Sequence, residues 1–154
     1  MRQGLTPDQE LERLLTAGSA LAADQLNAGL RVTWSPLRAP QRTHSVTALV
    51  ALFRRAGYVS DVLPEPSEAV MVYRGELVGD DDPGISWTAD LAIARRYAQG
   101  YATVGDTRVM QATAPPVAIL ARFRQDAEVV VAPELLSDAE LLGYIPHFQL
   151  PLVR

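Results

Sequence analysis

Apolar residues in the first sixty positions recur at helical spacing. The pattern predicts one or two amphipathic helices over residues 7–28, with Gly29 as the stop signal at the C-terminal end. Trp34 falls in the loop that is expected to follow. Ser45 is a suitable N-cap for a further helix, which we expect to end at Gly57. Helices should therefore dominate the N-terminal part of the chain.

Beyond residue 68 the pattern changes to short runs of β-branched and aromatic residues. Residues 69–73 predict a strand that ends at Arg74 and Gly75. Residues 85–88 predict a second short strand, followed by a helix over residues 89–99. Further strands are expected at 107–112, 117–123, 128–132 and, as an edge strand with two prolines, within 144–153.

These elements predict an α+β fold, in which N-terminal helices are followed by a mostly antiparallel, split β-sheet core. We expect a single domain, residues 1–154, with a helical lobe over 1–60 and a β core over 68–153. No apolar run reaches the ~18–20 residues that a membrane span needs, and the N-terminus is polar. We therefore expect a cytoplasmic protein with no membrane partner.

All fourteen basic side chains of the chain are arginines. The lack of lysine excludes a Schiff base or a P-loop lysine, and the lack of cysteine excludes a thiol nucleophile and disulfides. His44 and His147 lie far apart in the sequence without carboxylate-rich spacing, so we expect no metal. Any catalysis must therefore depend on carboxylates, hydroxyls, arginine or these two histidines.

Charge is unevenly distributed. Residues 1–60 carry seven arginines and four acids (+3), whereas residues 61–154 carry seven arginines and fourteen acids (−7). General attraction to nucleic acid is therefore not expected. An acid-free arginine stretch within residues 31–55 still offers a surface for an anionic partner such as nucleic acid, unless its members are solvated surface side chains. The stretch contains Arg31, Arg38, Arg42, Arg54 and Arg55.

Polar groups stand on three predicted strands where the pattern favours apolar ones. Arg74 follows five apolar residues, and Ser86 and Thr88 share one face of their strand. Glu128 opens an apolar strand, which should fix and partly desolvate its carboxylate, and Asp126 would share its face if the strand extended backward. Taken singly, each feature also fits an ordinary structural role, such as a surface arginine or a solvated glutamate.

Residues 72–75 (VYRG), 84–88 (GISWT) and 126–133 (DAEVVVAP), in this order, resemble the ADP-ribosyltransferases of the arginine–serine–glutamate class. This class includes the clostridial C3-like and binary toxins and the arginine-specific vertebrate ectoenzymes. The resemblance covers about residues 68–136 and includes the proline-containing stretch 114–121 that precedes the glutamate strand in many small bacterial and phage members.

The resemblance implies a mono-ADP-ribosyltransferase. Such an enzyme cleaves NAD at the nicotinamide–ribose bond and transfers ADP-ribose to a macromolecular acceptor, for which a protein is the first expectation. Glu128 would stabilise the positive charge that develops on the ribose, and Ser86 would orient Glu128. Arg74 would bind the pyrophosphate of NAD in forked geometry. NAD is then a substrate, and no metal is required.

The resemblance also implies three further NAD contacts, and the sequence differs from the family pattern at one position. Gly75 and Thr88 fall within the NAD-binding motifs, and Tyr97 matches an aromatic position that packs against nicotinamide. Asp126 stands where arginine-modifying members carry Glu and others often carry Gln. A shorter carboxylate can still orient or deprotonate a nucleophile, which favours a guanidinium or hydroxyl acceptor.

Other functions remain compatible with these residues. An NAD glycohydrolase would use water in place of the acceptor. A non-catalytic module of the same fold would bind NAD or a protein partner. The small size fits a bacterial or phage effector or toxin, and a phage structural or packaging accessory protein is a further alternative.

Overall fold

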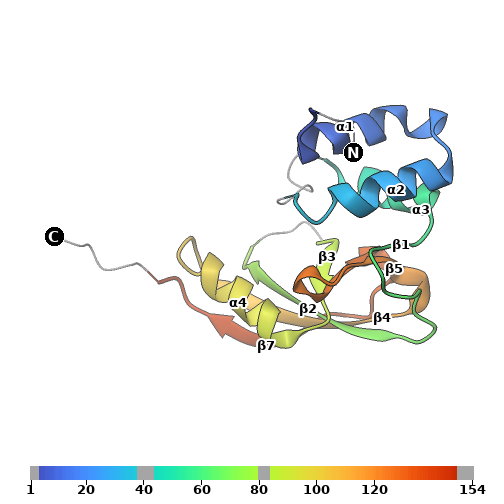
Figure 1. The fold of residues 1–154 in the computed structure, drawn as a ribbon. Helices are drawn as coiled ribbons and strands as arrows, with labels where there is room; N and C mark the ends of the chain where they lie inside the picture. The colour runs from blue at the N-terminus through green and yellow to red at the C-terminus, as the bar shows by residue number, and fades with distance from the viewer. Residues whose placement is uncertain (1–3, 38–43, 80–83, 149–154) are drawn as a thin grey trace.

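The computed structural model describes residues 4–37, 44–79 and 84–148, in which a three-helix lobe precedes a seven-stranded sheet (Figure 1). The helices are α1 (Pro7–Ala17), α2 (Ala23–Thr33), α3 (Val46–Ala56) and α4 (Leu91–Tyr101). The strands are β1 (Val59–Ser60), β2 (Val70–Leu77), β3 (Ser86–Thr88), β4 (Thr107–Ala114), β5 (Ile119–Arg122), β6 (Glu128–Val131) and β7 (Glu140–Ile145). Short 3-10 turns are η1 (Gly18–Ala20), η3 (Pro116–Ala118), η4 (Gln125–Ala127) and η5 (Pro133–Leu135).

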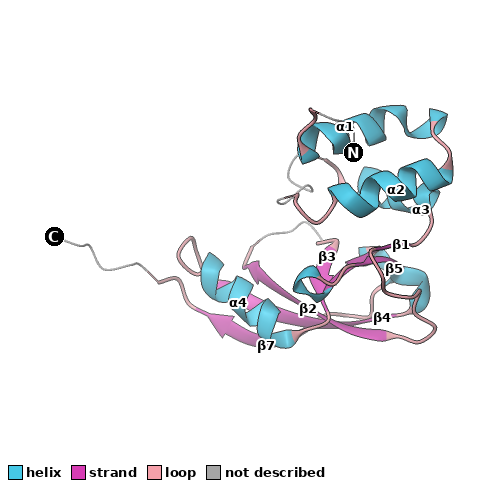
Figure 2. Ribbon diagram, in the orientation of Figure 1, coloured by secondary structure: helices cyan, strands magenta, loops and turns pink. Residues whose placement is uncertain are grey.

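The sheet has the strand order β1-β5-β6-β3-β2-β4-β7 (Figure 2). Within the described residues its neighbouring strands are antiparallel, except for the parallel pair β1 and β5. The predicted α+β fold, with N-terminal helices and a mostly antiparallel sheet, is confirmed. β2 pairs with β4 along its whole length but with β3 only at Tyr73 and Thr88. A single bridge pair therefore joins the two halves of the sheet.

The lobe forms because each of its helices buries one apolar face. The Thr6 side chain accepts a hydrogen bond from the Gln9 N–H, and the Gln9 side chain accepts one from the Thr6 N–H, which closes a capping box on α1. Ser45 caps α3 as predicted, and its hydroxyl accepts from the Ala48 N–H. Helices α1, α2 and α3 share one core with strands β5 and β6, which includes Leu11, Leu14, Leu26, Leu30, Leu49, Leu52, Phe53, Leu120, Ala121 and Val130.

α4 packs closely on β2. Asp90 caps the helix by accepting a hydrogen bond from the Ala92 N–H. Ala94 and Ala98 are fully buried on the side that faces the sheet. A Cβ atom on Gly75 of β2 would overlap the carbonyl oxygen of Ala94 and lie 2.6 Å from the Ala98 nitrogen. Only glycine permits this distance between strand and helix.

The strand register places α4 and the lobe over the same face of the sheet. Directly paired residues of antiparallel strands project their side chains to the same side. Tyr73, which packs under α4, pairs with Thr88, and Thr88 pairs with Glu128. Val130, which packs under the lobe, pairs with Ser86. The β3–β6 pair therefore lies between α4 and the lobe (Figure 1), with Ser86 and Glu128 on the covered face.

Several predicted boundaries are wrong. Gly29 lies inside α2 and is buried there, because packing overrides its weak preference for a helix end. Arg74 does not end its strand, because β2 continues to Leu77 and pairs with β4 throughout. The last strand, β7, starts earlier than expected and shares only Tyr144 and Ile145 with the segment 144–153, but it lies at the edge of the sheet as predicted. Residues 149–153 lie outside the described part of the chain. The two-residue strand β1 is too short to leave a pattern.

Gly75→Ala should destabilise the fold, because the added methyl group overlaps the backbone of α4. We expect the free energy of unfolding to fall by about 1–3 kcal/mol in urea denaturation followed by circular dichroism. The control is Gly100→Ala on α4, where nothing lies within 4 Å of the added methyl group. This control should gain about 0.5–1 kcal/mol, since alanine favours a helix over glycine. Equal effects of the two substitutions would contradict the packing described.

Candidate active site

Ser86 and Glu128 are in direct contact on the covered face of the sheet. The Ser86 hydroxyl donates a hydrogen bond of 2.6 Å to Oε2 of Glu128. The contact follows from the β3–β6 register, which aligns Ser86 with Val130 and Thr88 with Glu128. A hydroxyl–carboxylate bond of this length is typical of an ionised acceptor. Two predicted site residues are therefore brought together.

Arg74 contacts the same serine from β2. Its Nη1 donates a hydrogen bond of 2.7 Å to the backbone carbonyl oxygen of Ser86. The guanidinium lies against Gly84, where any Cβ atom would overlap it. Its Nε is buried and has no hydrogen-bond partner within the described residues. Because β2 and β3 separate beyond their bridge pair, Arg74 joins the two strands where their backbones no longer do.

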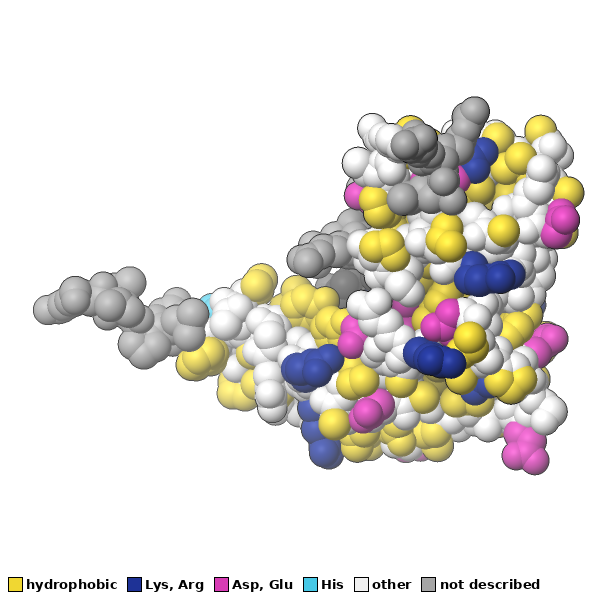
Figure 3. Space-filling view, in the orientation of Figure 1, with side chains coloured by type: hydrophobic (Ala, Val, Ile, Leu, Met, Phe, Trp, Pro, Cys, Tyr) yellow, Lys and Arg dark blue, Asp and Glu magenta, His cyan; other side chains and the backbone are white. Residues whose placement is uncertain are grey.

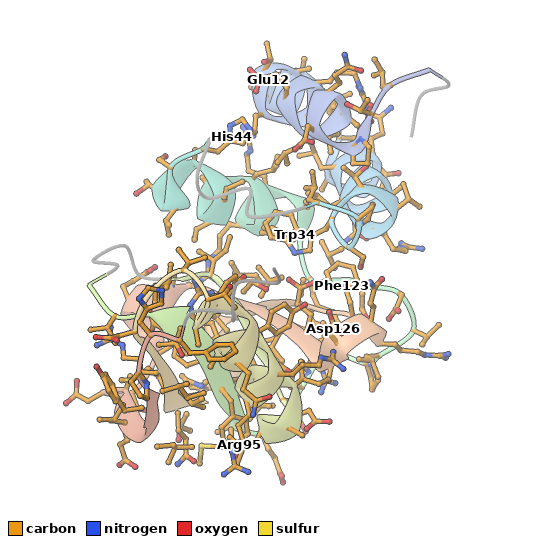
Figure 4. All side chains as sticks on the ribbon, turned by 90° about the vertical axis from the view of Figure 1, so that its left-hand side faces the viewer. Glu12, Trp34, His44, Arg95, Phe123 and Asp126 are labelled. Carbon is orange, nitrogen blue, oxygen red and sulfur yellow. The ribbon has the colours of Figure 1, made fainter. Side chains whose placement is uncertain are left out.

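Trp34, at the end of α2, is a member of the site that sequence analysis missed. Its side chain is buried, and its Nε1 donates a hydrogen bond of 2.9 Å to Oε2 of Glu128. The indole ring packs edge-on against Phe53 of α3, with ring centroids 4.8 Å apart. Figure 4 shows Trp34 at the junction between the lobe and the sheet. A buried indole N–H needs an acceptor, but no sequence pattern identifies a glutamate 94 residues away as that acceptor.

The surroundings raise the pKa of Glu128 above its ordinary value. Burial of the carboxyl group is the largest cause, and the negative charge of Asp126 acts in the same direction. The hydrogen bonds from Ser86 and Trp34 favour the ionised form and oppose this rise in pKa. Both bonds go to Oε2, so Oε1 accepts no hydrogen bond from the described part of the chain.

Asp126 lies in turn η4, because β6 begins at Glu128 and does not extend backward, so the condition for Asp126 to share the face of Glu128 on the strand is not met. Asp126 and Ala127 have φ angles of 57° and 46°, in the left-handed region that L-residues rarely adopt. Two hydrogen bonds hold the turn. The Thr88 hydroxyl donates to the Asp126 carbonyl at 2.7 Å, and the Ala89 N–H donates to the Ala127 carbonyl at 3.0 Å. The turn directs the Asp126 side chain to α4.

Two side chains of α4 hold the Asp126 carboxylate. The Tyr97 hydroxyl donates a hydrogen bond of 2.6 Å to Oδ2, and Arg96 Nη2 lies 3.2 Å from Oδ1. The hydrogen bond to Asp126, together with burial and nearby charge, raises the pKa of Tyr97 to about 12. The phenol therefore stays protonated at neutral pH and donates its hydrogen bond to Asp126. The Tyr97 ring is 42% exposed and stacks on Tyr101 with centroids 6.3 Å apart.

Two further predicted site residues make contacts within the fold. The buried Thr88 hydroxyl accepts a hydrogen bond from the Asp90 N–H in addition to donating to Asp126. Gly75 faces α4. Thr88 therefore supports the turn that carries Asp126, and Gly75 sets the distance between β2 and α4. Direct contact of either residue with NAD stays a prediction.

Three of the five arginines of the 31–55 stretch are described, and Arg38 and Arg42 lie outside the described residues. Arg31, Arg54 and Arg55 are exposed on α2 and α3. On the face seen in Figure 3, basic and acidic side chains are interspersed. Binding of nucleic acid by this stretch stays a prediction.

The described ranges contain no cluster of three or more His, Cys, Asp or Glu side chains that could hold a metal ion. No helix in those ranges is long and apolar enough to cross a bilayer.

No protein-family model, curated protein or solved structure matches this chain. Its membership of the arginine–serine–glutamate class stays a prediction, which rests on the motifs around Arg74, Ser86 and Glu128.

Glu128→Gln should stabilise the protein at neutral pH. The pKa of this carboxyl group is higher in the folded chain than in the unfolded chain, so the folded state binds more protons between the two values. Stability then falls as pH rises through that interval, so this side chain costs stability at neutral pH. The amide removes this cost, while its oxygen can still accept from Ser86 and Trp34.

Denaturation of both proteins at neutral pH and near pH 4 tests this expectation. The difference in the free energy of unfolding between Glu128→Gln and the wild type should shrink as pH falls below the ordinary glutamate pKa of about 4.3. Glu134→Gln, at an exposed position in η5, is the matched control and should change stability little. A loss of stability in Glu128→Gln at neutral pH would contradict the raised pKa.

Proposed function

We propose that the protein is a mono-ADP-ribosyltransferase that consumes NAD, with Glu128 as its catalytic carboxylate. The observation that carries the proposal is the position of Ser86 between two charged groups. Its hydroxyl donates to Glu128, and its carbonyl oxygen accepts from Arg74. The residues of three motifs that are separate in sequence are thus connected, and they are the residues on which the resemblance to ADP-ribosyltransferases rests.

The proposed reaction breaks the bond between nicotinamide and ribose. The bonding electron pair leaves with nicotinamide, and positive charge develops on the ribose. A fixed carboxylate that faces this charge stabilises the transition state more than the ground state. Because Ser86 and Trp34 both bind Oε2 of Glu128, Oε1 is the oxygen left to accept a hydrogen bond from a ribose hydroxyl.

Two further residues suit the rest of NAD. The planar guanidinium of Arg74 matches phosphate oxygens, and its Nε, which has no partner among the described residues, is a donor that a pyrophosphate oxygen would satisfy. The exposed ring of Tyr97 suits stacking against nicotinamide.

Asp126 is the group that we propose to orient the acceptor. Its carboxylate lies two residues before Glu128 and is held by Tyr97 and Arg96. A carboxylate at this place can accept a proton from an incoming hydroxyl or guanidinium nucleophile. A protein of the host cytoplasm is the acceptor class that we propose, with the chain acting as a bacterial or phage effector.

Glu128→Gln should abolish most NAD cleavage without loss of the fold. Removal of a preorganised charge of this kind costs about 10²–10³-fold in kcat. Ser86→Ala should cost about tenfold or more, since it removes one hydrogen bond to the charged carboxylate. Nicotinamide release from NAD, with cell lysate as the acceptor source, is the measurement, and Glu134→Gln should match the wild type. Release that is equal in wild type and Glu128→Gln would refute the assignment.

Asp126→Asn should separate transfer from hydrolysis. If Asp126 serves the acceptor alone, the variant should transfer at least tenfold less labelled ADP-ribose to lysate protein while nicotinamide release in buffer changes much less. Parallel losses in both assays would show that Asp126 does not serve the acceptor alone. Nicotinamide release with no labelled product would favour the glycohydrolase, and NAD binding without any release would favour the non-catalytic module.

A further inference from the structure

The hydrogen bond between Trp34 and Glu128 connects the lobe to the carboxylate. Trp34 is 3% exposed, and its indole N–H donates a hydrogen bond of 2.9 Å to Oε2 of Glu128. Among the described residues, Ser86 is the only other donor to that oxygen. Donors to an ionised group in a desolvated place are worth more than the same donors in water. The indole cannot rotate freely to another acceptor, because its ring is held edge-on by Phe53.

We propose that Trp34 is a positioning residue for Glu128, so that the helical lobe is a working part of the active site and not only its cover. Two donors on one oxygen fix the plane of the carboxylate. This arrangement leaves Oε1, to which no described residue donates, available to a substrate hydroxyl. The inference rests on the proposed function for its catalytic consequence, but the positioning itself is a property of the free protein.

Other groups act on Glu128 as well, and all of them remain when the indole N–H is removed. The negative charge of Asp126 in η4 opposes ionisation of Glu128. Tyr97 of α4 lies close enough to Glu128 for the negative charge of Glu128 to raise the pKa of Tyr97. Arg96, on the same helix, binds Asp126. Arg74 of β2 reaches Glu128 only through Ser86.

Trp34→Phe removes the N–H and keeps an aromatic ring next to Phe53. In this variant the carboxylate should ionise at higher pH, because one of the two hydrogen bonds that favour the ionised form is lost. The control is Leu14→Val, a conservative change at a fully buried position on α1 that loosens the lobe without a change at Trp34 or Glu128. A merely structural role of Trp34 predicts the same behaviour for both variants.

The experiment follows the carboxyl carbon of Glu128 by NMR through a pH titration, with ¹³C-labelled glutamate and Glu128→Gln to assign the signal. We expect a higher midpoint in Trp34→Phe than in the wild type and an unchanged midpoint in Leu14→Val. In NAD cleavage, Trp34→Phe should show kcat lowered about tenfold, a smaller change in KM, and an acid limb moved to higher pH.

The outcomes separate the two proposals. An unchanged midpoint in Trp34→Phe overturns the positioning role, whatever the activity of the protein. A shifted midpoint in a protein that does not cleave NAD supports the positioning role and refutes the proposed function. If Trp34→Phe does not fold, the indole N–H resonance of Trp34 in the wild type replaces it. That resonance should titrate together with Glu128, and its failure to do so overturns the proposal.

Discussion

A carboxylate that is withdrawn from water needs hydrogen-bond donors around it, and Glu128 receives them from two distant parts of the chain. Ser86 supplies a hydroxyl from the neighbouring strand, and Trp34 supplies an indole N–H from the end of α2. The second bond exists only because the lobe packs on β5 and β6 through a shared apolar core. Packing of the lobe and ionisation of Glu128 are therefore linked. If the lobe did not pack on the sheet, Glu128 would lose the hydrogen bond from Trp34 that favours its ionised form.

The neighbouring carboxylate is supported in a different way. Asp126 lies two residues before Glu128, but the left-handed turn directs it to α4, where Tyr97 and Arg96 bind it. The negative charge of Asp126 opposes ionisation of Glu128, and separate donors for the two carboxylates reduce that cost. The lobe serves one carboxylate and α4 serves the other, and both helical elements cover the same face of the sheet.

Short-range sequence patterns predicted the fold class and the candidate polar residues on apolar strands, but they did not predict which side chains contact each other. Ser45 as a cap and Gly57 as a helix end depend on short-range hydrogen bonding and backbone freedom, and both are confirmed. Ser86 and Glu128 were identified as candidates because polar groups on apolar strands are unusual, and their contact follows from strand register. The contact of Trp34 with Glu128 was not predicted, because it depends on how α2 packs on strands that lie far along the sequence.

The Trp34 hydrogen bond also limits how this architecture can be rebuilt by recombination. The segment after α3 looks like a natural junction, because helices precede it and almost the whole sheet follows it. A chain cut and rejoined there with a different helical cover would keep the strands and their register. It would nevertheless lose one of the two donors to Glu128, unless the new cover happened to place an N–H at the same point. The boundary is therefore clear in secondary structure but does not divide the molecule into interchangeable modules.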